Sequence, residues 1–348
     1  MTGELSMGRD LHGHEERSFA VDTTPPLGER GWDTAVTEAI VARMRADRSV
    51  VLMGLEVSRY RADLIEEFGP LRVIDTPISE NGVVGMAVGA ARAGLQPIVD
   101  LWHASFVYIV MDQLLNGLSL SQGLFGLPAP VVLKMRTGIP VRTPGTTHAR
   151  MPHWMLAGVP GIDVIYPSCA EDAGPLMAAA LRGLRPTIFL EHIDLCKQQP
   201  SGPVPQRLEV GEANTVATGA DVTVVALGPT VRHALAARAE LDGVLDLEVL
   251  DLRSLEPLDL DTVLASVRKT RRLVIVDEAP SKTSFAWWLS GAVRAQVPEL
   301  LAEPRCVTAM EGPIPYSPHG LAPGIVPQPA DIVAAARCTA SLTTGVTP

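Results

Sequence analysis

Short apolar runs alternate with longer amphipathic stretches through most of the 348 residues of this chain. The runs are rich in branched side chains and too short for helices, which is typical of strands buried on both faces of a parallel sheet. In the first half of the chain they occupy residues 50–54, 73–74, 97–101, 131–134, 163–166 and 187–191. Apolar residues recur at helical spacing in residues 32–46, 59–68, 106–120 and 171–182, and another helix is expected to begin at Glu80.

The alternation stops in residues 198–212, which are polar and rich in proline and glycine, and then resumes. The later strands are expected at 222–227, 245–251, 272–276 and 305–308, with helices at 231–241, 260–269 and 285–297. We therefore predict an α/β fold of two domains, each a mostly parallel sheet flanked by helices. The expected boundaries are a mobile tail at 1–30, a first domain at 31–197, a linker at 198–212 and a smaller domain at 213–348.

Charge and composition narrow the class of protein. A formal net charge of −10 argues against nucleic acid or an anionic membrane as the main partner. No apolar stretch reaches spanning length, and residues 1–20 are too polar for a secretory leader. The four cysteines are scattered without metal-ligand spacing, so reduced thiols in a cytoplasmic protein are expected. His12 and His14 lack a third ligand, and no metal site is predicted from them.

Glu80 stands where a short strand gives way to a helix. Residues 75–77 (Asp-Thr-Pro) end the strand, and small residues such as Gly82 and Gly85 follow in the helix. Two interpretations of Glu80 remain open from the pattern alone. The carboxylate is either a first-turn acid that the helix dipole favours, or a buried group aimed at a ligand that the glycines leave room for.

Residues 75–80 read Asp-Thr-Pro-Ile-Ser-Glu, and this motif resembles the beta subunit of thiamine-diphosphate-dependent 2-oxo acid dehydrogenases, the first components of the pyruvate, branched-chain and acetoin systems. The resemblance extends over residues 31–338. It implies a transketolase-like pyrimidine-binding domain followed by a transketolase C-terminal domain. It also implies that Glu80 is catalytic, because the corresponding acid contacts the aminopyrimidine ring of the cofactor and drives its change to the imino form.

The resemblance assigns roles to two further residues. Phe106 matches an aromatic residue that stacks on the aminopyrimidine, although a core aromatic is the commoner fate of a phenylalanine on a helix. His148 matches an active-site proton donor, a task that suits imidazole near neutral pH, and its alternative is a loop histidine bonded to backbone. His103 lies between strand and helix where it could face substrate, but the family offers no match for it. His153 matches no active-site position and is expected to be structural.

Two loops depart from the family pattern. The family carries two acids after the glycine at position 54; here Leu55 replaces the first, and the segment that follows is shorter. Glu56 either lines the cofactor pocket or is a solvated loop acid. Arg136 leads into a loop rich in glycine and proline, and its planar guanidinium suits either a substrate carboxylate or a surface salt bridge.

One motif is missing from the whole chain. The family's enzymes hold the diphosphate through Mg²⁺ with Gly-Asp-Gly and a distant Asn, and no Gly-Asp-Gly occurs here. The resemblance therefore implies that a partner alpha subunit holds most of the Mg²⁺ and diphosphate site in an α₂β₂ heterotetramer. The small and apolar residues of 82–95 and 105–125 suit such an interface, or equally a domain core.

These observations predict the beta-type subunit of a two-component thiamine-diphosphate oxidoreductase that decarboxylates a 2-oxo acid and transfers the acyl unit, with a lipoyl carrier as a further partner left open. A carboligase that passes a two-carbon unit to an aldehyde is the first alternative. An inactive scaffolding or regulatory partner of an alpha chain is the second. A nicotinamide enzyme is disfavoured because no Gly-x-Gly-x-x-Gly follows a strand.

Overall fold

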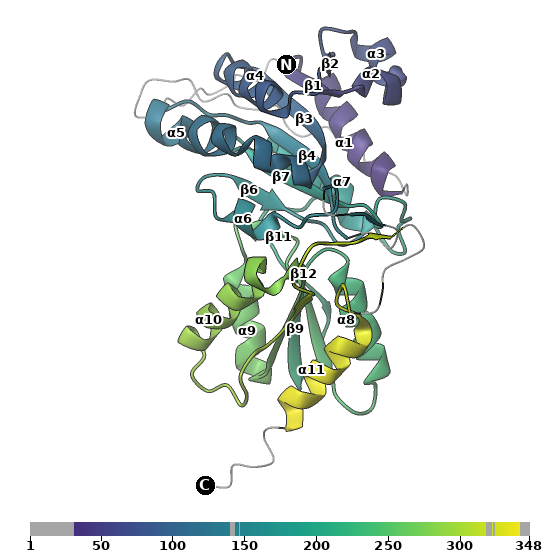
Figure 1. Cartoon of the computed structure of the whole chain (residues 1–348), viewed down its shortest axis with the longest axis vertical. Helices are drawn as coiled ribbons and strands as arrows, with labels where there is room; N and C mark the ends of the chain where they lie inside the picture. Colours follow the sequence, from purple (N-terminus) through teal and green to yellow (C-terminus); the bar gives the residue numbers. More distant parts are fainter. Residues whose placement is uncertain (1–30, 140–142, 146, 318–321, 323, 342–348) are drawn as a thin grey trace, which may run out of the picture.

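The computed structural model describes residues 31–139, 143–145, 147–317, 322 and 324–341. The expected tail at 1–30 lies outside the described residues, as does part of the loop before His148. The described chain forms two lobes, each built around one sheet, which Figure 1 shows stacked along the long axis of the molecule. This arrangement confirms the predicted α/β class with two mostly parallel sheets.

The first sheet has the strand order β11-β6-β7-β4-β3-β1-β2 and is parallel except for β11, which runs antiparallel to β6. Two apolar clusters cover its faces: α1 and α7 pack on one side, and α4 and η2 on the other. The strands are β1 (Val50–Leu55), β2 (Val73–Thr76), β3 (Gln96–His103), β4 (Val132–Thr137), β6 (Asp163–Ile165), β7 (Thr187–His192) and β11 (Ser254–Glu256). The principal helices are α1 (Trp32–Ala46), α2 (Val57–Tyr60), α3 (Ala62–Phe68), α4 (Glu80–Arg92), α6 (His153–Ala157) and α7 (Ala170–Arg182).

The second sheet has the order β13-β12-β9-β10-β8, with β8 antiparallel to β10. Its central strands are buried along their whole length, which matches their nearly continuous apolar sequence. The strands are β8 (Asn214–Ala217), β9 (Val222–Ala226), β10 (Leu247–Asp251), β12 (Leu273–Pro280) and β13 (Arg305–Ala309). The helices are α8 (Thr230–Glu240), α9 (Leu260–Thr270), α10 (Ala286–Gln296) and α11 (Pro329–Ser341), and a short η3 covers Ser281–Thr283. A small ribbon pairs β5 (Thr143–Pro144) with β14 (Tyr316–Ser317).

The prediction of one continuous helix at 106–120 is wrong. The structure has a 3₁₀-helix η1 (Ala104–Ile109), a π-helix η2 (Gln113–Ser119) and then α5 (Leu120–Phe125). Ala104, Val107 and Val110 are buried at a spacing of three, which is the repeat of a 3₁₀-helix. The chain must turn tightly where it leaves β3, and this tight turn places Phe106 beside the carboxyl end of the sheet.

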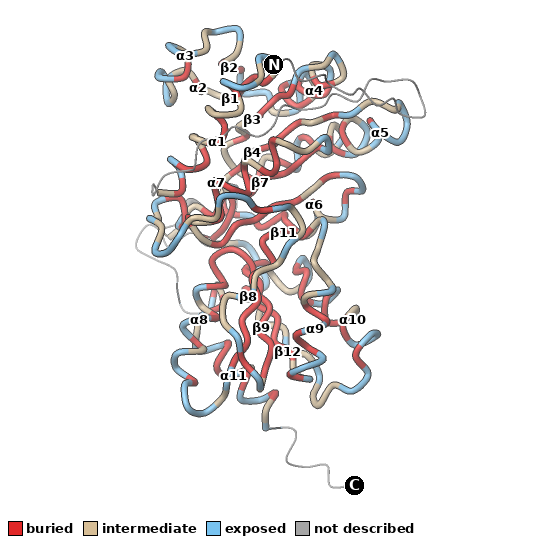
Figure 2. The backbone as a smooth tube through the Cα atoms, turned by 180° about the vertical axis from the view of Figure 1, so that it is seen from behind, coloured by how far each residue is buried: buried red, intermediate tan, exposed pale blue. Residues whose placement is uncertain are grey.

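The two lobes share buried structure rather than touching only at their surfaces. Strand β11 lies beyond the predicted linker in the sequence but closes the edge of the first sheet. One apolar cluster contains residues of both lobes, including Tyr166 and Phe285, and buried segments run through the junction in Figure 2. Across the same junction Arg253 Nε donates to Asp172 at 2.6 Å. The lobes are therefore held by a common core.

Candidate active site

The site residues gather at the carboxyl ends of β1, β2, β3 and β4, which meet at one edge of the first sheet. Glu80 is the first residue of α4, directly after β2, and it is half-buried. Phe106 comes from η1 after β3 and is also half-buried. Both line one small cavity of about 30 Å³, together with Thr76, Pro77, Ile78, Val83, Leu101, Leu55, Asp100 and Trp102. The structure thus brings these two residues together.

Ring side chains from three segments meet beside this cavity. The Phe106 ring centroid lies 5.6 Å from that of His148 and 5.7 Å from that of His103. The two imidazoles are 5.0 Å apart, in an edge-to-face arrangement. The sequence expected Phe106 and His148 at one site and left His103 without a family match. The structure places all three in contact, although it assigns them no role.

The two histidines differ in their surroundings. Thr147 Oγ1 lies 2.9 Å from His148 Nδ1, so this hydroxyl orients the ring. In the described part of the chain no hydrogen bond to His148 Nε2 occurs, which leaves that nitrogen available to a ligand. Burial lowers the pKa of His103, and the neighbouring His148 and Arg136 lower it further. His103 is therefore neutral near pH 7 and can donate or accept one hydrogen bond.

Trp102 holds the end of β3 in an unusual conformation. Its φ of 62° is in the left-handed region, which a bulky residue rarely adopts. The backbone N–H of Trp102 donates to Asp100 Oδ1 at 3.0 Å, and the indole Nε1 donates to the Leu55 carbonyl at 3.2 Å. Strained residues of this kind concentrate at functional sites. Here the strain coincides with the bulge that turns His103 toward Phe106.

An ion-pair chain lies under this edge of the sheet. Lys134 Nζ is 3.1 Å from Asp100 Oδ2 and 2.7 Å from Glu191 Oε2. Burial alone would raise the pKa of Asp100, but the adjacent Lys134 ammonium holds that pKa below its usual value. Burial alone would likewise lower the pKa of Lys134, and the two carboxylates raise it instead. Asp100 and Lys134 therefore stay charged, and this chain of ion pairs stiffens the floor of the site.

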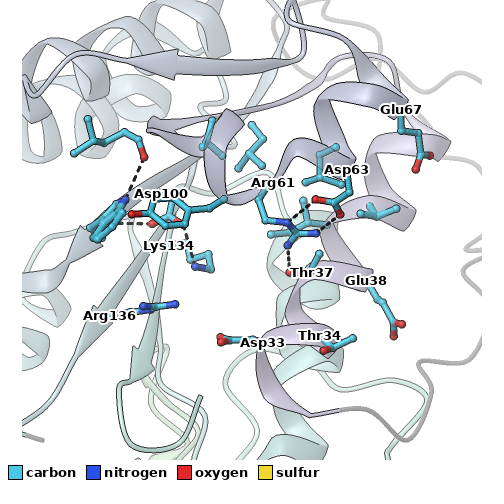
Figure 3. Close-up of a pocket in the computed structure, with 18 of the residues that line it drawn as sticks. Asp33, Thr34, Thr37, Glu38, Arg61, Asp63, Glu67, Asp100, Lys134 and Arg136 are labelled. Atoms are coloured by element: carbon cyan, nitrogen blue, oxygen red, sulfur yellow. Dashed lines mark hydrogen bonds and ion pairs between the residues drawn. The ribbon is translucent and has the colours of Figure 1, made fainter. Parts of the chain in front are cut away.

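A second cavity of about 810 Å³ opens on the other side of Trp102 (Figure 3). It lies between α1, the α2–α3 segment and the ends of β1, β3 and β4. Leu55, Asp100 and Trp102 line both cavities and form the wall between them. Arg136, which the sequence suggested could bind a substrate carboxylate, lines the large cavity and not the small one. The sequence did not predict this cavity, although the segment after Glu56, which is shorter than in the family, lies next to it.

Glu56 lies away from both cavities. It adopts φ 52° just before α2, is exposed, and its Oε1 is 3.6 Å from Arg59 Nη1. Glu56 lines neither of the two cavities. Within the described chain this placement matches the solvated loop acid, the other interpretation that the sequence left open. A cofactor contact for Glu56 stays a prediction that depends on a partner chain.

Two glycines of α4 have open surroundings among the residues that the structure describes. The nearest atoms to a side chain placed at Gly85 would be those of the Gln113 side chain, at 3.3 Å, and no described atom lies within 4 Å of such a group at Gly89. Apolar side chains are exposed on the same side of the lobe, from Ile78 (78%) and Met86 to the η1–α5 segment. The exposed large apolar residues of that segment are Tyr108, Ile109, Leu115, Leu120, Leu124 and Phe125. Several exposed apolar side chains on neighbouring elements suit an interface.

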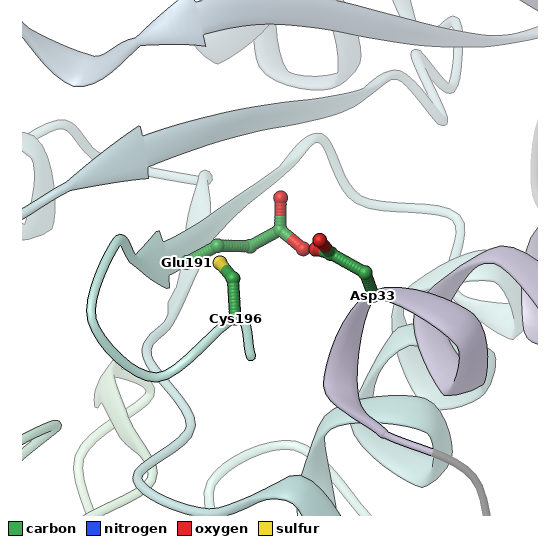
Figure 4. Close-up of side chains that lie close together, drawn as sticks. All are labelled: Asp33, Glu191 and Cys196. Carbon is green, nitrogen blue, oxygen red and sulfur yellow. The ribbon is translucent and has the colours of Figure 1, made fainter. Parts of the chain in front are cut away.

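Among the described residues, one group of three possible metal ligands converges: Asp33, Glu191 and Cys196, shown in Figure 4. Burial raises the pKa of the Cys196 thiol, so it stays protonated and is a poor ligand. Glu191 is already paired with Lys134, which supplies the positive charge there. The arrangement is explained as a polar cluster of two buried residues and the exposed Asp33. Among the helices in the described part of the chain, none combines the length and apolar character that crossing a bilayer requires.

Two protein-family models match most of this chain. The models named "Transketolase, pyrimidine binding domain" and "Transketolase, C-terminal domain" match residues 29–198 and 211–332. The chain is 36% identical to the pyruvate dehydrogenase E1 component subunit beta of Rhizobium meliloti, covering 87% of this chain and 68% of that one. It is 37% identical to the acetoin:2,6-dichlorophenolindophenol oxidoreductase subunit beta of Cupriavidus necator, covering 88% and 96%.

Among solved structures, the chain resembles one described as "Split gene transketolase, inactive beta4 tetramer". The TM-score is 0.74 at 21% identity, and the match covers 91% of this chain and 100% of that chain. At this identity the likeness concerns the fold alone. It agrees with the two stacked sheets seen here.

Proposed function

This chain belongs to the thiamine-diphosphate-dependent family of E1 beta subunits with transketolase-type domains, and from that premise we propose that it decarboxylates a 2-oxo acid together with a partner subunit and transfers the acyl unit. The observation that carries this proposal is the meeting of three side chains at one edge of the first sheet. Glu80 and Phe106 line one cavity, and the Phe106 ring is 5.6 Å from His148. A chain kept only as a scaffold has no physical need for this convergence.

The residues present fit one half of the cofactor. A carboxylate at the cavity edge and an aromatic ring beside it match the edge and the face of an aminopyrimidine. The cavity of about 30 Å³ is too small to enclose that ring, and the exposed Ile78 at its mouth shows that it opens outward. A second chain would therefore complete the enclosure. When bound, thiamine diphosphate supplies the carbanion that adds to the 2-oxo group.

Each residue of the chain has a distinct task in this proposal. Glu80 accepts a hydrogen bond from the ring nitrogen of the aminopyrimidine and holds the proton there. Phe106 packs against the ring and excludes water from that face. His148, oriented through Nδ1 by Thr147, presents Nε2 to the substrate and gives or takes the proton at the carbonyl oxygen. His103, packed against both rings, helps to position the substrate.

The partner in this proposal is an alpha subunit that binds the diphosphate and Mg²⁺ within an α₂β₂ heterotetramer. The chain lacks Gly-Asp-Gly, so it does not carry the motif that holds these groups in the family. The open glycines of α4 and the exposed apolar residues of the η1–α5 segment offer a surface for that subunit. A lipoyl carrier is the acceptor of the acyl unit in the dehydrogenase form of the proposal.

A carboligase remains the second candidate because of the large cavity. It opens where the segment after Glu56 is short, and it provides room beside Trp102 and Arg136 for an aldehyde acceptor. Acyl transfer to a lipoylated carrier protein, measured against ligation to an aldehyde with the same 2-oxo acid, separates the two. Faster ligation selects the carboligase.

Glu80→Gln tests the proposal directly, in the complex of the full chain with its alpha subunit. Because the amide cannot hold the ring proton, we expect turnover to fall by about 10²–10⁴-fold, the usual contribution of acid–base catalysis. Glu66→Gln, an exposed acid on α3, is the matched control and should retain activity. Near-normal turnover by the Glu80 variant, with the complex assembled, refutes the role.

A further inference from the structure

The cavity of about 810 Å³ carries an inference that deepens the proposed function and rests on it. Its volume is in the range of small-molecule sites, and it opens at the same edge of the sheet as Glu80, Phe106 and His148. The wall formed by Leu55, Asp100 and Trp102 separates it from the smaller cavity. A ligand that reacts beside His148 can therefore extend a substituent past Trp102 into this space.

Three of the four basic groups that line the cavity are neutralised by acids. Arg45 Nε is 2.6 Å from Glu67, Arg61 Nη2 is 2.8 Å from Asp63, and Lys134 pairs with Asp100 and Glu191. The fourth is Arg136. Its half-buried guanidinium makes no hydrogen bond or ion pair within the described residues, and it points into open space in Figure 3. A partly desolvated guanidinium without a counter-ion favours an anionic ligand.

Asp100 does not supply the missing partner. Burial raises the pKa of Asp100, and Lys134 lowers it. The positive charge of Arg136 also lowers this pKa, by less than Lys134 does, so the two groups interact electrostatically. The Asp100 oxygens, however, already accept bonds from Lys134 Nζ and from the backbone N–H of Trp102. The guanidinium of Arg136 is thus left with its donors free for a group that enters from the cavity.

Arg136 is also next to the reacting edge. It is the register partner of His103 on the neighbouring parallel strand, and adjacent strands lie about 4.8 Å apart. The His103 ring is in turn 5.0 Å from His148. A short chain of carbon atoms is enough to join a carbonyl group at His148 to an anion at Arg136.

We propose that this cavity is a specificity subsite in which Arg136 binds a second anionic group, a carboxylate or phosphate, carried by the acyl donor or the acyl acceptor. The two oxygens of such a group match the paired donors of the guanidinium. Arg136 is a substrate-binding residue in this account. The preferred substrates are dicarboxylic 2-oxo acids or phosphorylated aldehydes rather than simple apolar ones.

Asp33 limits where the anion can bind. It is an exposed carboxylate at the start of α1 that lines the wall of the cavity formed by this helix. An anion entering the cavity is repelled by it and attracted by Arg136. Asp33→Asn should therefore tighten binding of a dianion by a few-fold, which is typical for removal of one nearby solvated charge.

The first experiment compares substrate pairs in the assembled enzyme. We expect kcat/KM for 2-oxoglutarate to exceed that for 2-oxopentanoate, or kcat/KM for glyceraldehyde 3-phosphate as acceptor to exceed that for glyceraldehyde. Arg136→Gln should reduce the preferred ratio by about 10–100-fold, the value of a charged hydrogen-bonded contact. Arg45→Gln, at the exposed rim and paired with Glu67, is the matched control and should change neither ratio.

The two substrate pairs also show whether the acyl donor or the acyl acceptor carries the second anion. Arg136→Gln should lower the kcat/KM ratio only for the pair whose substrate carries it. Arg136→Lys keeps the charge without the paired donors and should recover part of this ratio. The proposal is overturned if both ratios change by less than about two-fold in Arg136→Gln, a change of only about 0.4 kcal/mol. It is equally overturned if substrates with and without the second anion lose activity together.

A binding measurement separates this inference from the proposed function. Glutarate and inorganic phosphate contain no 2-oxo group, so calorimetry of the full chain with each probe tests the cavity without any turnover. Binding that is lost in Arg136→Gln and tightened in Asp33→Asn supports the subsite even if Glu80→Gln were to leave turnover intact. Binding that is unchanged in Arg136→Gln contradicts the subsite, whatever the enzyme does.

Discussion

Two regions of this protein that combine histidines with acids differ sharply in the surroundings of these side chains. At the edge of the first sheet, Glu80, His103 and His148 are half-buried; Glu80 lines the small cavity, and the two histidines pack against the Phe106 ring beside it. At the junction of the lobes, His153 Nε2 is 3.0 Å from Asp277 Oδ1, and His192 Nε2 is 2.9 Å from Glu278 Oε2. All four of these junction residues are buried. The same residue types can thus serve a ligand in one place and hold the fold in the other.

The difference lies in how many hydrogen-bond partners the protein itself supplies. Asp277 is also bonded by the Ser284 hydroxyl at 2.7 Å and by the Ala279 N–H at 3.1 Å. Glu278 Oε1 accepts from the Ile139 N–H at 2.7 Å, across the junction. Partners of this kind leave the Asp277 carboxylate little capacity for a ligand. At the sheet edge the corresponding capacity is left open, and this is what distinguishes a site from a structural contact.

The strongest test of the comparison removes one member of a junction pair. Burial alone would raise the pKa of Asp277, yet His153 and Ser284 hold it below its usual value, so the carboxylate is strongly stabilised. Asp277→Ala should lower the free energy of unfolding by about 3–5 kcal/mol, because a buried partner loses its counterpart. Denaturant unfolding of the full chain measures this. A loss below about 1 kcal/mol, the worth of an exposed pair, would place the pair among weak surface contacts.

The second test substitutes two histidines of one short segment. His148→Ala should reduce turnover of the assembled enzyme by about 100-fold or more, because it removes the proposed proton donor. It should change the free energy of unfolding by less than about 1 kcal/mol, since its side chain is only partly buried. His153→Ala is the matched variant and should do the reverse, with a large loss of stability. Equal effects of both variants on stability would contradict the comparison.

The smallest expected effect concerns pH and Asp251, another buried acid near the junction. Burial raises the pKa of Asp251 to about 6, and Asp172 adds to the shift against the hydrogen bond from Ser168. The folded state therefore binds this proton more tightly than the unfolded state. The stability that Asp251 contributes is present below its unfolded pKa and is lost as pH rises through about 6.

Asp251→Asn isolates this contribution because the amide does not titrate. We expect the free energy of unfolding of wild type, relative to the variant, to fall by about 1–3 kcal/mol between pH 4 and pH 7. Chemical denaturation at several pH values gives the difference. A difference that stays constant with pH would show that the carboxyl group titrates normally in the folded protein.

Much of the fold was predictable because it depends on local patterns. Branched apolar runs predicted the parallel strands, and the Pro- and Gly-rich segment predicted a division near residues 198–212. The segment 106–120 was predicted as one helix and proved to be 3₁₀ and π turns, because its form depends on the tight exit from β3. Strand β11 joins the first sheet from the far side of the predicted linker, which no local pattern indicates.

By itself, the sequence determined that Glu80 lies at a strand–helix junction and that this chain lacks a diphosphate motif. Only the tertiary structure decided that Phe106, His103 and His148 meet, that Arg136 forms no ion pair among the described residues, and that Glu56 is exposed beside Arg59. The physical reason is the range of the interactions involved. Burial periodicity acts within a few residues, whereas cavities and ion pairs depend on strand order and on loops that separate segments of the chain bring together.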